Sequence, residues 1–383
     1  MNSIDDDNVD SSSWIVAPIK SIKGRGSVSN IAGRYETQTT EVIDDGWWHD
    51  EELGRISAGS TQVTHEIAKS ILSRNQSPDL PFSVSLNPYR GCEHGCIYCF
   101  ARPSHAYLGL SPGLDFETRL FAKINAAELL RRELASKSYT ASAIALGVNT
   151  DAYQPCERKL QLTRQILQVL KECKHPVGLI TKSSLIERDI DLLAEMAKDQ
   201  LVVVAITITT LDHDISRTLE PRAASPTRRI ETIRRLANAG IPVSVSVAPI
   251  IPFVTDQDLE SILQSAFDAG ATCAGYTILR LPWEVNPLFQ QWLEAHFPDR
   301  AGRVMNRIRD MRGGKDYDAK FGSRMKGEGL WADMIRQRFE KTISRLGVRN
   351  SSRFHWLDTS LFRKPLSVPV TAKQGDEQLD LFS

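Results

Sequence analysis

Three cysteines lie close together in the sequence, at Cys92, Cys96 and Cys99. They follow the turn-forming pair Asn87-Pro88, which ends an apolar run. A loop of this kind can fold around a metal centre. Three thiolates are one ligand short of an ordinary closed zinc site. They suit a [4Fe–4S] cube, with three irons held by the protein and the fourth left open.

Other chemistry for these thiols remains open at this point: a zinc ion, a disulfide, or reduced thiols with a structural role. A zinc site would need a fourth ligand, and His94 or His105 could supply one. The three remaining cysteines, Cys156, Cys173 and Cys273, are scattered, so the chain shows no disulfide framework.

Polar residues gather where several short β-branched runs end. Single fragments of this kind are more often helix caps than ligands. A series of them behind a cysteine triad is hard to obtain by chance, so we expect them to form one site. The fragments are Thr150-Asp151 after the run at 141–147, Lys182-Ser183 after the run at 176–181, Thr207 at the end of the run at 201–208, and Glu220-Pro221-Arg222 beyond it.

Together with the cysteine loop, these fragments resemble the radical S-adenosylmethionine (SAM) enzymes, and among them an uncharacterised bacterial subgroup of the spore photoproduct lyase-like branch. The resemblance extends over roughly residues 20–345. The motifs that carry it are Asn87-Pro88-Tyr89-x-Gly91-Cys92, Tyr98-Cys99-Phe100-Ala101-Arg102, Thr150-Asp151-x-Tyr153-Gln154-Pro155-x-Glu157, Thr181-Lys182-Ser183 and Glu220-Pro221-Arg222.

The resemblance implies a [4Fe–4S] cluster held by Cys92, Cys96 and Cys99, with SAM chelating the open iron through its amino and carboxylate groups. An electron from an external donor then cleaves the sulfonium and yields a 5′-deoxyadenosyl radical. The residues expected to contact SAM are Tyr98, Thr150, Asp151, Lys182, Thr207 and Arg222.

One departure from the lyases concerns hydrogen transfer. The lyases place a hydrogen-donating cysteine at the end of the second strand, where this chain has Val148-Asn149. Cys156 lies beyond the Thr150-Asp151 pair and is not an obvious equivalent. We therefore do not expect thymine-dimer reversal. Damaged or modified DNA is the first expectation for the substrate, and a modified RNA or a protein side chain stays open.

The elements that must position these residues follow a regular rhythm from residue 82 onward. Six alternating strand–helix units predict a parallel sheet with right-handed crossovers. The resemblance implies more, namely an α/β partial (β/α)6 TIM-type barrel with its chemistry at the C-terminal strand ends. The expected strands are residues 82–86, 141–147, 176–181, 201–208, 242–248 and 273–279.

Local signals place several helix ends. Ser184 and Glu187 have the spacing of a capping box, and Ser225-Pro226 has the pattern of an N-cap followed by proline. A short helix is predicted near residues 64–72, and longer ones at 283–297 and 329–346.

These patterns divide the 383 residues into five parts. They are an acidic disordered tail (1–19), an N-terminal extension packed on the barrel (20–80), the barrel (81–282), a helical basic C-terminal extension (283–360) and a flexible tail (361–383).

Charge is distributed unevenly along the chain. The totals are 47 basic and 47 acidic residues, but residues 300–353 contain 15 Lys or Arg against 6 Asp or Glu. This asymmetry predicts a nucleic-acid partner for the 300–353 region. It also supports a rival hypothesis, an accessory protein that binds nucleic acid and keeps its iron–sulfur cluster for structure or redox sensing.

The last residues, Gln378-Leu379-Asp380-Leu381-Phe382, place three large apolar side chains in a polar tail. The peptide is similar to the motif by which bacterial DNA polymerases and repair proteins bind the replication sliding clamp, so the clamp is an expected partner. The alternative is that these side chains fold back onto the barrel. The sequence shows no signal peptide and no apolar run of about 20 residues, which predicts a cytoplasmic protein without membrane contact.

Overall fold

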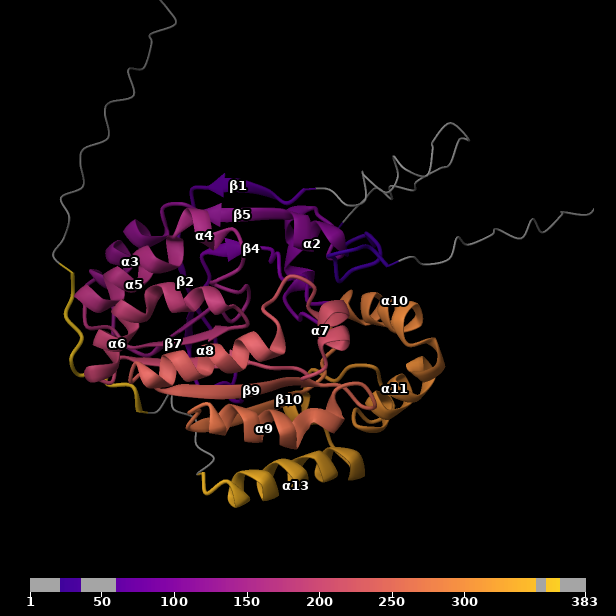
Figure 1. The fold of residues 1–383 in the computed structure, drawn as a ribbon. Helices are drawn as coiled ribbons and strands as arrows, with labels where there is room; N and C mark the ends of the chain where they lie inside the picture. The colour runs from indigo at the N-terminus through magenta and orange to yellow at the C-terminus, as the bar shows by residue number, and fades with distance from the viewer. Residues whose placement is uncertain (1–20, 36–59, 349–355, 366–383) are drawn as a thin grey trace, which may run out of the picture.

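The computed structural model describes residues 21–35, 60–348 and 356–365 (Figure 1). The predicted terminal motif at residues 378–382 lies outside the described residues, as do residues 349–353 of the basic region. Within the described residues, no helix is both long and apolar enough to cross a membrane.

A seven-stranded sheet forms the centre of the fold, in the order β10-β9-β8-β7-β6-β3-β2. All neighbouring strands are parallel except β2 and β3, which are antiparallel. The strands are β2 (Leu72–Arg74), β3 (Val84–Leu86), β6 (Ile144–Leu146), β7 (Val177–Thr181), β8 (Val202–Thr207), β9 (Val243–Ile250) and β10 (Cys273–Ile278). The six predicted strands and their parallel arrangement are therefore confirmed.

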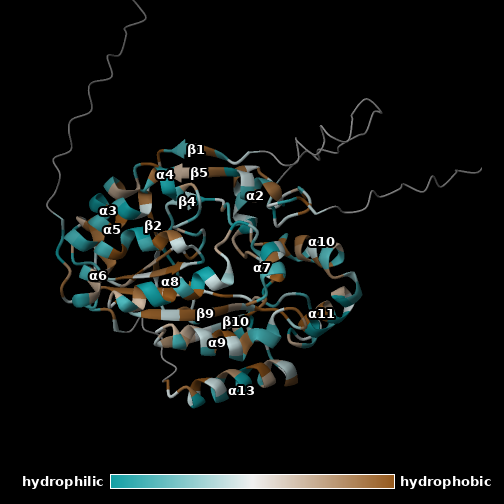
Figure 2. Cartoon of the chain, viewed as in Figure 1, coloured by the Kyte–Doolittle hydropathy of each residue, from teal (hydrophilic) through white to brown (hydrophobic). Residues whose placement is uncertain are grey.

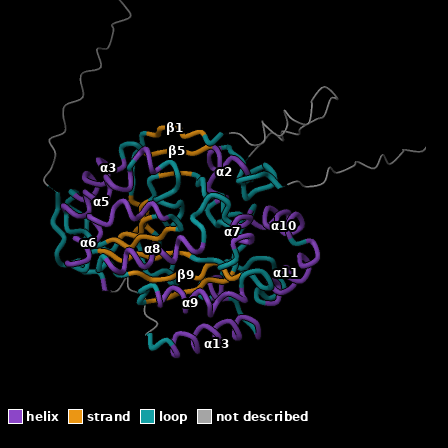
Figure 3. The backbone as a smooth tube through the Cα atoms, in the orientation of Figure 1, coloured by secondary structure: helices purple, strands orange, loops and turns teal. Residues whose placement is uncertain are grey.

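Helices cover the outside of this sheet, and neighbouring ones pack against each other in chain order (Figures 1 and 3). They are α3 (Ala126–Leu134), α5 (Leu162–Glu172), α6 (Ile190–Lys198), α8 (Pro226–Asn238) and α9 (Leu259–Asp268), with the 3-10 helices η2 (Ser184–Asp189) and η3 (Asp256–Asp258). The short helices α4 (Glu157–Leu160) and α7 (His213–Leu219) come after the ends of β6 and β8. The residues of β9 are largely hydrophobic, whereas much of α8 is hydrophilic (Figure 2). The core therefore lies between the strands and the helix faces that cover them.

The capping predictions had different outcomes. Ser225 caps α8 as predicted, and its side chain accepts a hydrogen bond from the N–H of Arg228. The capping box at Ser184 is wrong by one residue, because the side chain of Ser183 accepts from the N–H of Leu185 instead. The carboxylate of Glu187 instead forms ion pairs with Arg228 and Arg235 of α8.

A second, three-stranded sheet was not predicted. It has the order β1-β5-β4, with β1 (Gln62–Glu66), β4 (Tyr89–Arg90) and β5 (Arg119–Lys123). The helix predicted near residues 64–72 is wrong, because this segment contains β1 and ends where β2 begins. The partner of β1 is β5, far along the chain, so tertiary pairing overrides the local pattern.

Further helices follow the last strand. They are α10 (Val285–His296), α11 (Pro298–Asp310), α12 (Ser323–Lys326) and α13 (Leu330–Arg345). α10 and α13 match the two predicted C-terminal helices. The remaining elements are η1 (Arg102–Leu108) and α2 (Leu114–Thr118), directly after the cysteines.

The seven-stranded sheet has two edges, β10 and β2, so the barrel is open at the side. Residues 311–327, here called the closing segment, contact both edges. Lys326 donates to the carbonyl of Tyr276 in β10 at 2.8 Å. Arg324 forms an ion pair with Asp79, in the loop between β2 and β3. The closing segment therefore links the two edges of the open sheet.

Candidate functional site: the cysteine loop and the strand ends

The cysteine loop, residues 91–100, connects β4 to η1. It begins at Gly91, whose φ of +73° is a conformation that favours glycine. A Cβ there would lie 2.7 Å from Leu120 and 2.9 Å from the carbonyl oxygen of Phe116. The N–H of Cys92 donates to that same carbonyl at 2.9 Å. The start of the loop is thus fixed against α2 and β5.

The three thiols of the loop lie in connected apolar surroundings, and their number matches the three protein ligands of a cluster with one open iron. None is in a disulfide, Cys92 and Cys96 are buried, and Cys99 packs against the apolar surroundings of both. Burial, the charge of Asp151 and the neighbouring thiols raise the pKa of Cys92. Burial is also the main reason that the pKa of Cys96 rises to about 12. Iron would hold such thiols as thiolates, because coordination offsets the charge that burial opposes.

The two histidines suggested as zinc ligands are engaged elsewhere. Nδ1 of His94 lies 3.3 Å from Oδ2 of Asp151. Nε2 of His105 lies 2.9 Å from the carbonyl oxygen of Arg119, and its ring packs edge-on against Phe116. Among the described residues, no three His, Cys, Asp or Glu side chains are grouped to hold a single metal ion. This result includes the three thiols, so they do not form a site for a single ion, whereas in a [4Fe–4S] cluster each thiolate binds a different iron.

Arg102 holds the cysteine loop through hydrogen bonds to its backbone carbonyls. Its side chain is fully buried and donates to the carbonyls of Cys96 at 2.9 Å and Gly95 at 3.1 Å. It also donates to two carbonyls ahead of α2 and forms a buried ion pair with Glu117. One guanidinium thereby satisfies loop carbonyls that no regular structure would satisfy.

The N-terminal segment closes over the same loop. The N–H groups of Gly26 and Ser27 donate to the carboxylate of Glu117 at 3.0 and 2.8 Å. Gly26 lies so close to Gly95 that a Cβ on Gly26 would sit 1.8 Å from the Gly95 carbonyl oxygen. Residues 21–35 therefore help to hold the cysteine loop.

The end of β6 is fastened to the loop by hydrogen bonds. The Thr150 hydroxyl donates to the carbonyl of Tyr89 at 3.0 Å. Gln154, fully buried, accepts from the N–H of Glu93 at 2.9 Å and donates to the carbonyl of Gly91 at 3.2 Å. Gln154 belongs to the motif that begins at Thr150, but it is not one of the predicted site residues. Its position beside Cys92 shows that it supports the loop.

Asp151 connects β6, β7 and the loop. Its carboxylate accepts from the Thr181 hydroxyl at 2.7 Å and the Lys182 N–H at 2.8 Å, and it faces His94. Burial raises its pKa, but His94 and the N–H donors of Lys182 and Tyr153 outweigh this and lower it to about 2. Both oxygens of Asp151 are thus engaged within the protein, and its contact with SAM stays a prediction.

Glu220 is a buried carboxylate with several polar contacts, one of which fixes Tyr98 in the site. Its carboxylate accepts hydrogen bonds from Tyr98 and Thr209 and pairs with the buried Arg229. Burial raises its pKa, but the charges of Arg229 and Lys182 lower it overall. The sequence motif pointed to Arg222 as well as Glu220, but Arg229 is the arginine that Glu220 meets.

Lys182 differs from these groups because its ammonium has no fixed partner. It lies at the end of β7, 5.8 Å from the centre of the Tyr98 ring. Among the described residues, it forms no ion pair and its ammonium donates no hydrogen bond. Burial lowers its pKa, but electrostatic interactions with Cys96 and Glu220 raise it overall. A charged ammonium is therefore held beside the cysteine loop, free to meet an anion.

The last two predicted contacts lie at different places. Thr207, at the end of β8, is buried, and its carbonyl accepts from Arg229 at 3.0 Å. Arg222 has different partners, since it pairs with Glu93 at 3.2 Å and donates to Thr61 at 3.1 Å. The structure thus gathers Tyr98, Lys182 and Thr207 around Glu220 and Arg229, and it places Arg222 apart from them.

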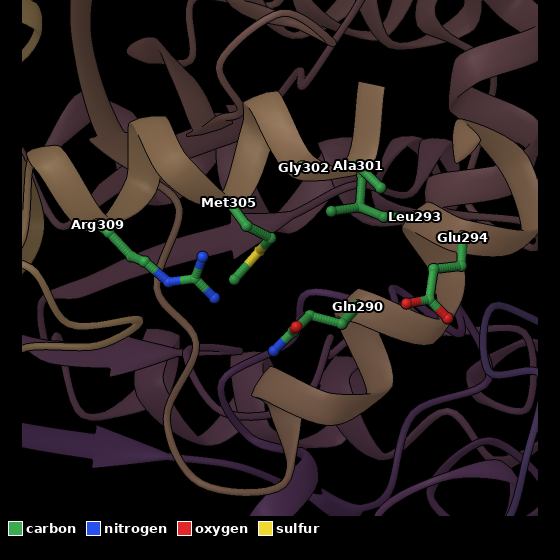
Figure 4. Close-up of a pocket in the computed structure, with 7 residues that line it drawn as sticks. All are labelled: Gln290, Leu293, Glu294, Ala301, Gly302, Met305 and Arg309. Atoms are coloured by element: carbon green, nitrogen blue, oxygen red, sulfur yellow. The ribbon is translucent and has the colours of Figure 1, made fainter. Parts of the chain in front are cut away.

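A separate pocket lies between α10 and α11 (Figure 4). Its volume is about 170 Å³, and its lining includes Gln290, Met305 and Arg309. None of its lining residues belongs to the cysteine loop or to a strand end. We therefore assign the site to the loop and not to this pocket.

Comparison with known proteins agrees with this assignment. The family model of the radical SAM superfamily matches residues 86–266. An uncharacterized protein of Mycobacterium tuberculosis is 37% identical over 243 residues, which cover 62% of this chain and 72% of that protein. The radical SAM Nα-GlyT isomerase of Pseudomonas phage M6 is 27% identical over 185 residues, covering 48% of this chain and 36% of the isomerase.

Solved structures of spore photoproduct lyase share the fold. One variant gives a TM-score of 0.55 at 13% identity and covers 82% of this chain and 86% of the lyase. The lyase complexed with a dinucleoside spore photoproduct gives 0.51 at 14% identity, with 79% and 84% covered. At such low identity these matches concern the fold alone, and they confirm the partial barrel. From the three-thiol loop, the family match and the relative with 72% coverage, the chain belongs to the radical SAM superfamily of enzymes, whose cofactors are a [4Fe–4S] cluster and S-adenosylmethionine.

Proposed function

We propose that this enzyme binds SAM between the cysteine loop and the ends of β6 to β8, and directs radical chemistry at a nucleic acid, with damaged or modified DNA as the substrate. The bound cluster supplies the electron that cleaves SAM to a 5′-deoxyadenosyl radical. The observation that carries the SAM site is Lys182, a charged and unpartnered ammonium beside Cys96. It would bind the carboxylate of SAM as a point charge.

The surrounding groups would orient SAM and keep water out. Tyr98 is buried over Glu220, which fixes its ring close to Lys182. Thr207 would face the cofactor from β8. Thr150 and Asp151 would act mainly by holding the loop, since their side chains already make internal hydrogen bonds.

The nucleic-acid substrate is supported by the name of a similar protein and by charge. One structural neighbour is described as complexed with a dinucleoside spore photoproduct. In the basic region several arginines are neutralised by partners, among them Arg309 by Asp316 and Arg338 by Glu260. Exposed cations such as Lys315 and Lys320 would contact the phosphates.

This chain departs from the pattern of the lyases at the position of their hydrogen-donating cysteine. Within the described residues, no cysteine stands between β6 and Thr150. Cys156 instead begins α4, packed near Tyr89 and Ala122, and burial raises its pKa. We therefore do not assign thymine-dimer reversal to this enzyme.

The test is anaerobic incubation of the reconstituted enzyme with SAM, a reductant and DNA or RNA that carries base lesions. Mass spectrometry would follow 5′-deoxyadenosine and altered bases. We expect deoxyadenosine in every case and altered bases only with the true substrate. If no reductant gives deoxyadenosine, the rival hypothesis of an accessory protein with a structural or redox-sensing cluster gains support.

Binding to DNA has its own signature. Affinity for duplex DNA should fall linearly with salt on logarithmic axes, because phosphate contacts release counterions. Replacing Lys315 and Lys320 with glutamate should weaken binding and flatten this slope. An unchanged slope would remove the basic region from the proposal.

We further propose that the terminal motif Gln378–Phe382 binds the sliding clamp and delivers this cytoplasmic enzyme to DNA. Each apolar side chain would contribute roughly 1.5–3 kcal/mol on full burial in the clamp. A labelled peptide of residues 374–383 should bind purified clamp, and the same peptide with Leu381→Ala and Phe382→Ala should not. If both peptides fail to bind, the clamp is not the partner of the tail.

A further inference from the structure

Arg280 lies at the same end of the barrel as the cysteine loop. It follows β10 by two residues, and its guanidinium stacks on the ring of Phe100, 5.5 Å from the ring centre. Phe100 directly follows Cys99 and is 47% exposed. Arg280 therefore borders the cysteine loop from β10, whereas Lys182 borders it from β7, and β8 and β9 separate these two strands in the sheet.

The guanidinium of Arg280 is poorly satisfied. One terminal nitrogen donates to the hydroxyl of Tyr317 at 3.2 Å, and the other approaches the sulfur of Met325 at 3.6 Å. A thioether sulfur is only a weak acceptor. The Nε–H is buried and has no hydrogen-bond partner. Among the described residues Arg280 forms no ion pair.

Other arginines near the site contrast with it. Arg102 and Arg229, equally close to the cysteine loop, each pair with a buried carboxylate. The neighbour of Arg280 is instead a second cation, Arg312. Burial and the charge of Arg280 lower the pKa of Arg312, which donates to the carbonyl of Leu279 at 2.9 Å. Two guanidiniums thus lie close together after the end of β10, and among the described residues neither forms an ion pair with a carboxylate.

A half-buried cation without a counter-ion is costly unless a ligand completes the site. The planar fork of arginine matches two oxygens of a phosphate, and such bonds are stronger than neutral ones. We propose that Arg280 binds a backbone phosphodiester of the nucleic-acid substrate and places the adjoining nucleotide beside Phe100. This inference rests on the proposed function, and it adds the residue that anchors the substrate.

The experiment uses the full-length, cluster-loaded enzyme with SAM and measures binding of two dinucleosides by calorimetry. Both contain two thymidines. One has a phosphodiester linkage and the other a neutral methylphosphonate linkage. The unaltered enzyme should bind the phosphodiester about tenfold more tightly, as expected for a charge-assisted hydrogen bond. In Arg280→Gln this preference should disappear, and Arg280→Lys should restore part of it.

A matched control is Arg132→Gln, which removes an exposed arginine of α3 that also has no ion pair among the described residues. It should keep the tenfold preference. Thermal unfolding and deoxyadenosine formation without substrate would verify that each variant is folded and loaded.

The outcomes separate the two proposals. If the unaltered enzyme binds both dinucleosides equally, or Arg280→Gln retains the preference, Arg280 is not the phosphate anchor and the nucleic-acid function stands. If the unaltered enzyme binds neither dinucleoside nor any longer oligonucleotide, the nucleic-acid function fails, and the assignment of Arg280 fails with it.

Discussion

The two sides of the cysteine loop differ in how far the protein satisfies its own polar groups. On the side of β6 to β8, Glu220 is buried and the side chain of Asp151 is 9% exposed, and both carboxylates accept internal hydrogen bonds. Lys182 alone among the predicted contacts there keeps a charge without a partner in the described structure. On the side of β10, Arg280 has an unpaired charge and a buried donor without an acceptor.

This difference separates a preorganised site from one that a ligand completes. Groups fixed by their own hydrogen bonds need no rearrangement when the cofactor binds. A substrate that must enter and leave is better served by groups whose bonding is incomplete without it. The β6 to β8 side has the first property and suits SAM. The β10 side has the second and suits the substrate.

The largest effect is expected on the cysteine loop, which both sides share. Cys99→Ala should remove the cluster, because two remaining thiols hold it poorly, and deoxyadenosine formation should fall to background. Iron content and visible absorption would measure the loss. Cys156→Ala is the control, since Cys156 lies outside the loop. It should keep about four irons per chain. Equal iron in both variants would contradict the assigned ligands.

Removing the support of the loop should come next. Arg102→Met leaves Glu117 buried without its cation, and four carbonyls lose their donor. Breaking a buried pair in this way costs about 3–5 kcal/mol of unfolding free energy. Urea unfolding would measure it.

Arg119→Met is the control for this change, because Arg119 is exposed and forms only a loose pair with Asp115 at 3.8 Å. A surface pair contributes about 0–1 kcal/mol. If Arg102→Met costs no more than Arg119→Met, the buried network does not hold the loop.

A smaller effect should appear on SAM binding. Lys182→Met should weaken SAM affinity roughly tenfold or more, because a charge-assisted hydrogen bond is lost, with little change in unfolding free energy. Arg222→Gln should affect SAM much less, since Arg222 pairs with Glu93. Calorimetric titration of the cluster-loaded enzyme would compare them. If Arg222→Gln lost more SAM affinity than Lys182→Met, the SAM carboxylate would be assigned to Arg222 instead of Lys182.

The sequence was informative where local pattern and chemistry coincide. The six barrel strands could be predicted because each is a short run of apolar, often β-branched residues, buried within the sheet. The cysteine loop was identifiable by its spacing. Lys182 could be placed at a strand end because the run before it is a clear strand.

Tertiary pairing was beyond prediction. The strand β1 is formed by pairing with β5, in which Gln62 lies opposite Arg119, 57 residues further along the chain, and its own residues show no burial pattern that marks a strand. Likewise, Glu220-Pro221-Arg222 suggested Arg222 as a ligand, but only the fold shows that Arg229 meets Glu220. That Arg280 lacks a carboxylate also depends on which segments surround it.

The smallest expected effect concerns the closing segment, which brings Tyr317 and Met325 to Arg280. Asp79→Asn would break the paired hydrogen bonds with Arg324 that tie this segment to the far edge of the sheet. A partly buried pair of this kind contributes about 1 kcal/mol. Hydrogen exchange of residues 311–327 at neutral pH should accelerate in the variant, whereas exchange in β7 and β8 should not change.

The pH dependence gives an independent check of the same pair. Hydrogen bonds from Arg324 are the main reason that the pKa of Asp79 lies below its usual value. A lowered pKa in the folded state means that the ionised carboxylate stabilises the fold above the ordinary pKa of Asp, and that this contribution is lost as the pH falls through the lowered value. The difference in unfolding free energy between the unaltered enzyme and Asp79→Asn should therefore be full at neutral pH and shrink in acid. If the difference is absent at pH 7, or if exchange in residues 311–327 is unaltered, the closing segment is held by its contacts with β10, and the surroundings of Arg280 do not depend on the far edge of the sheet.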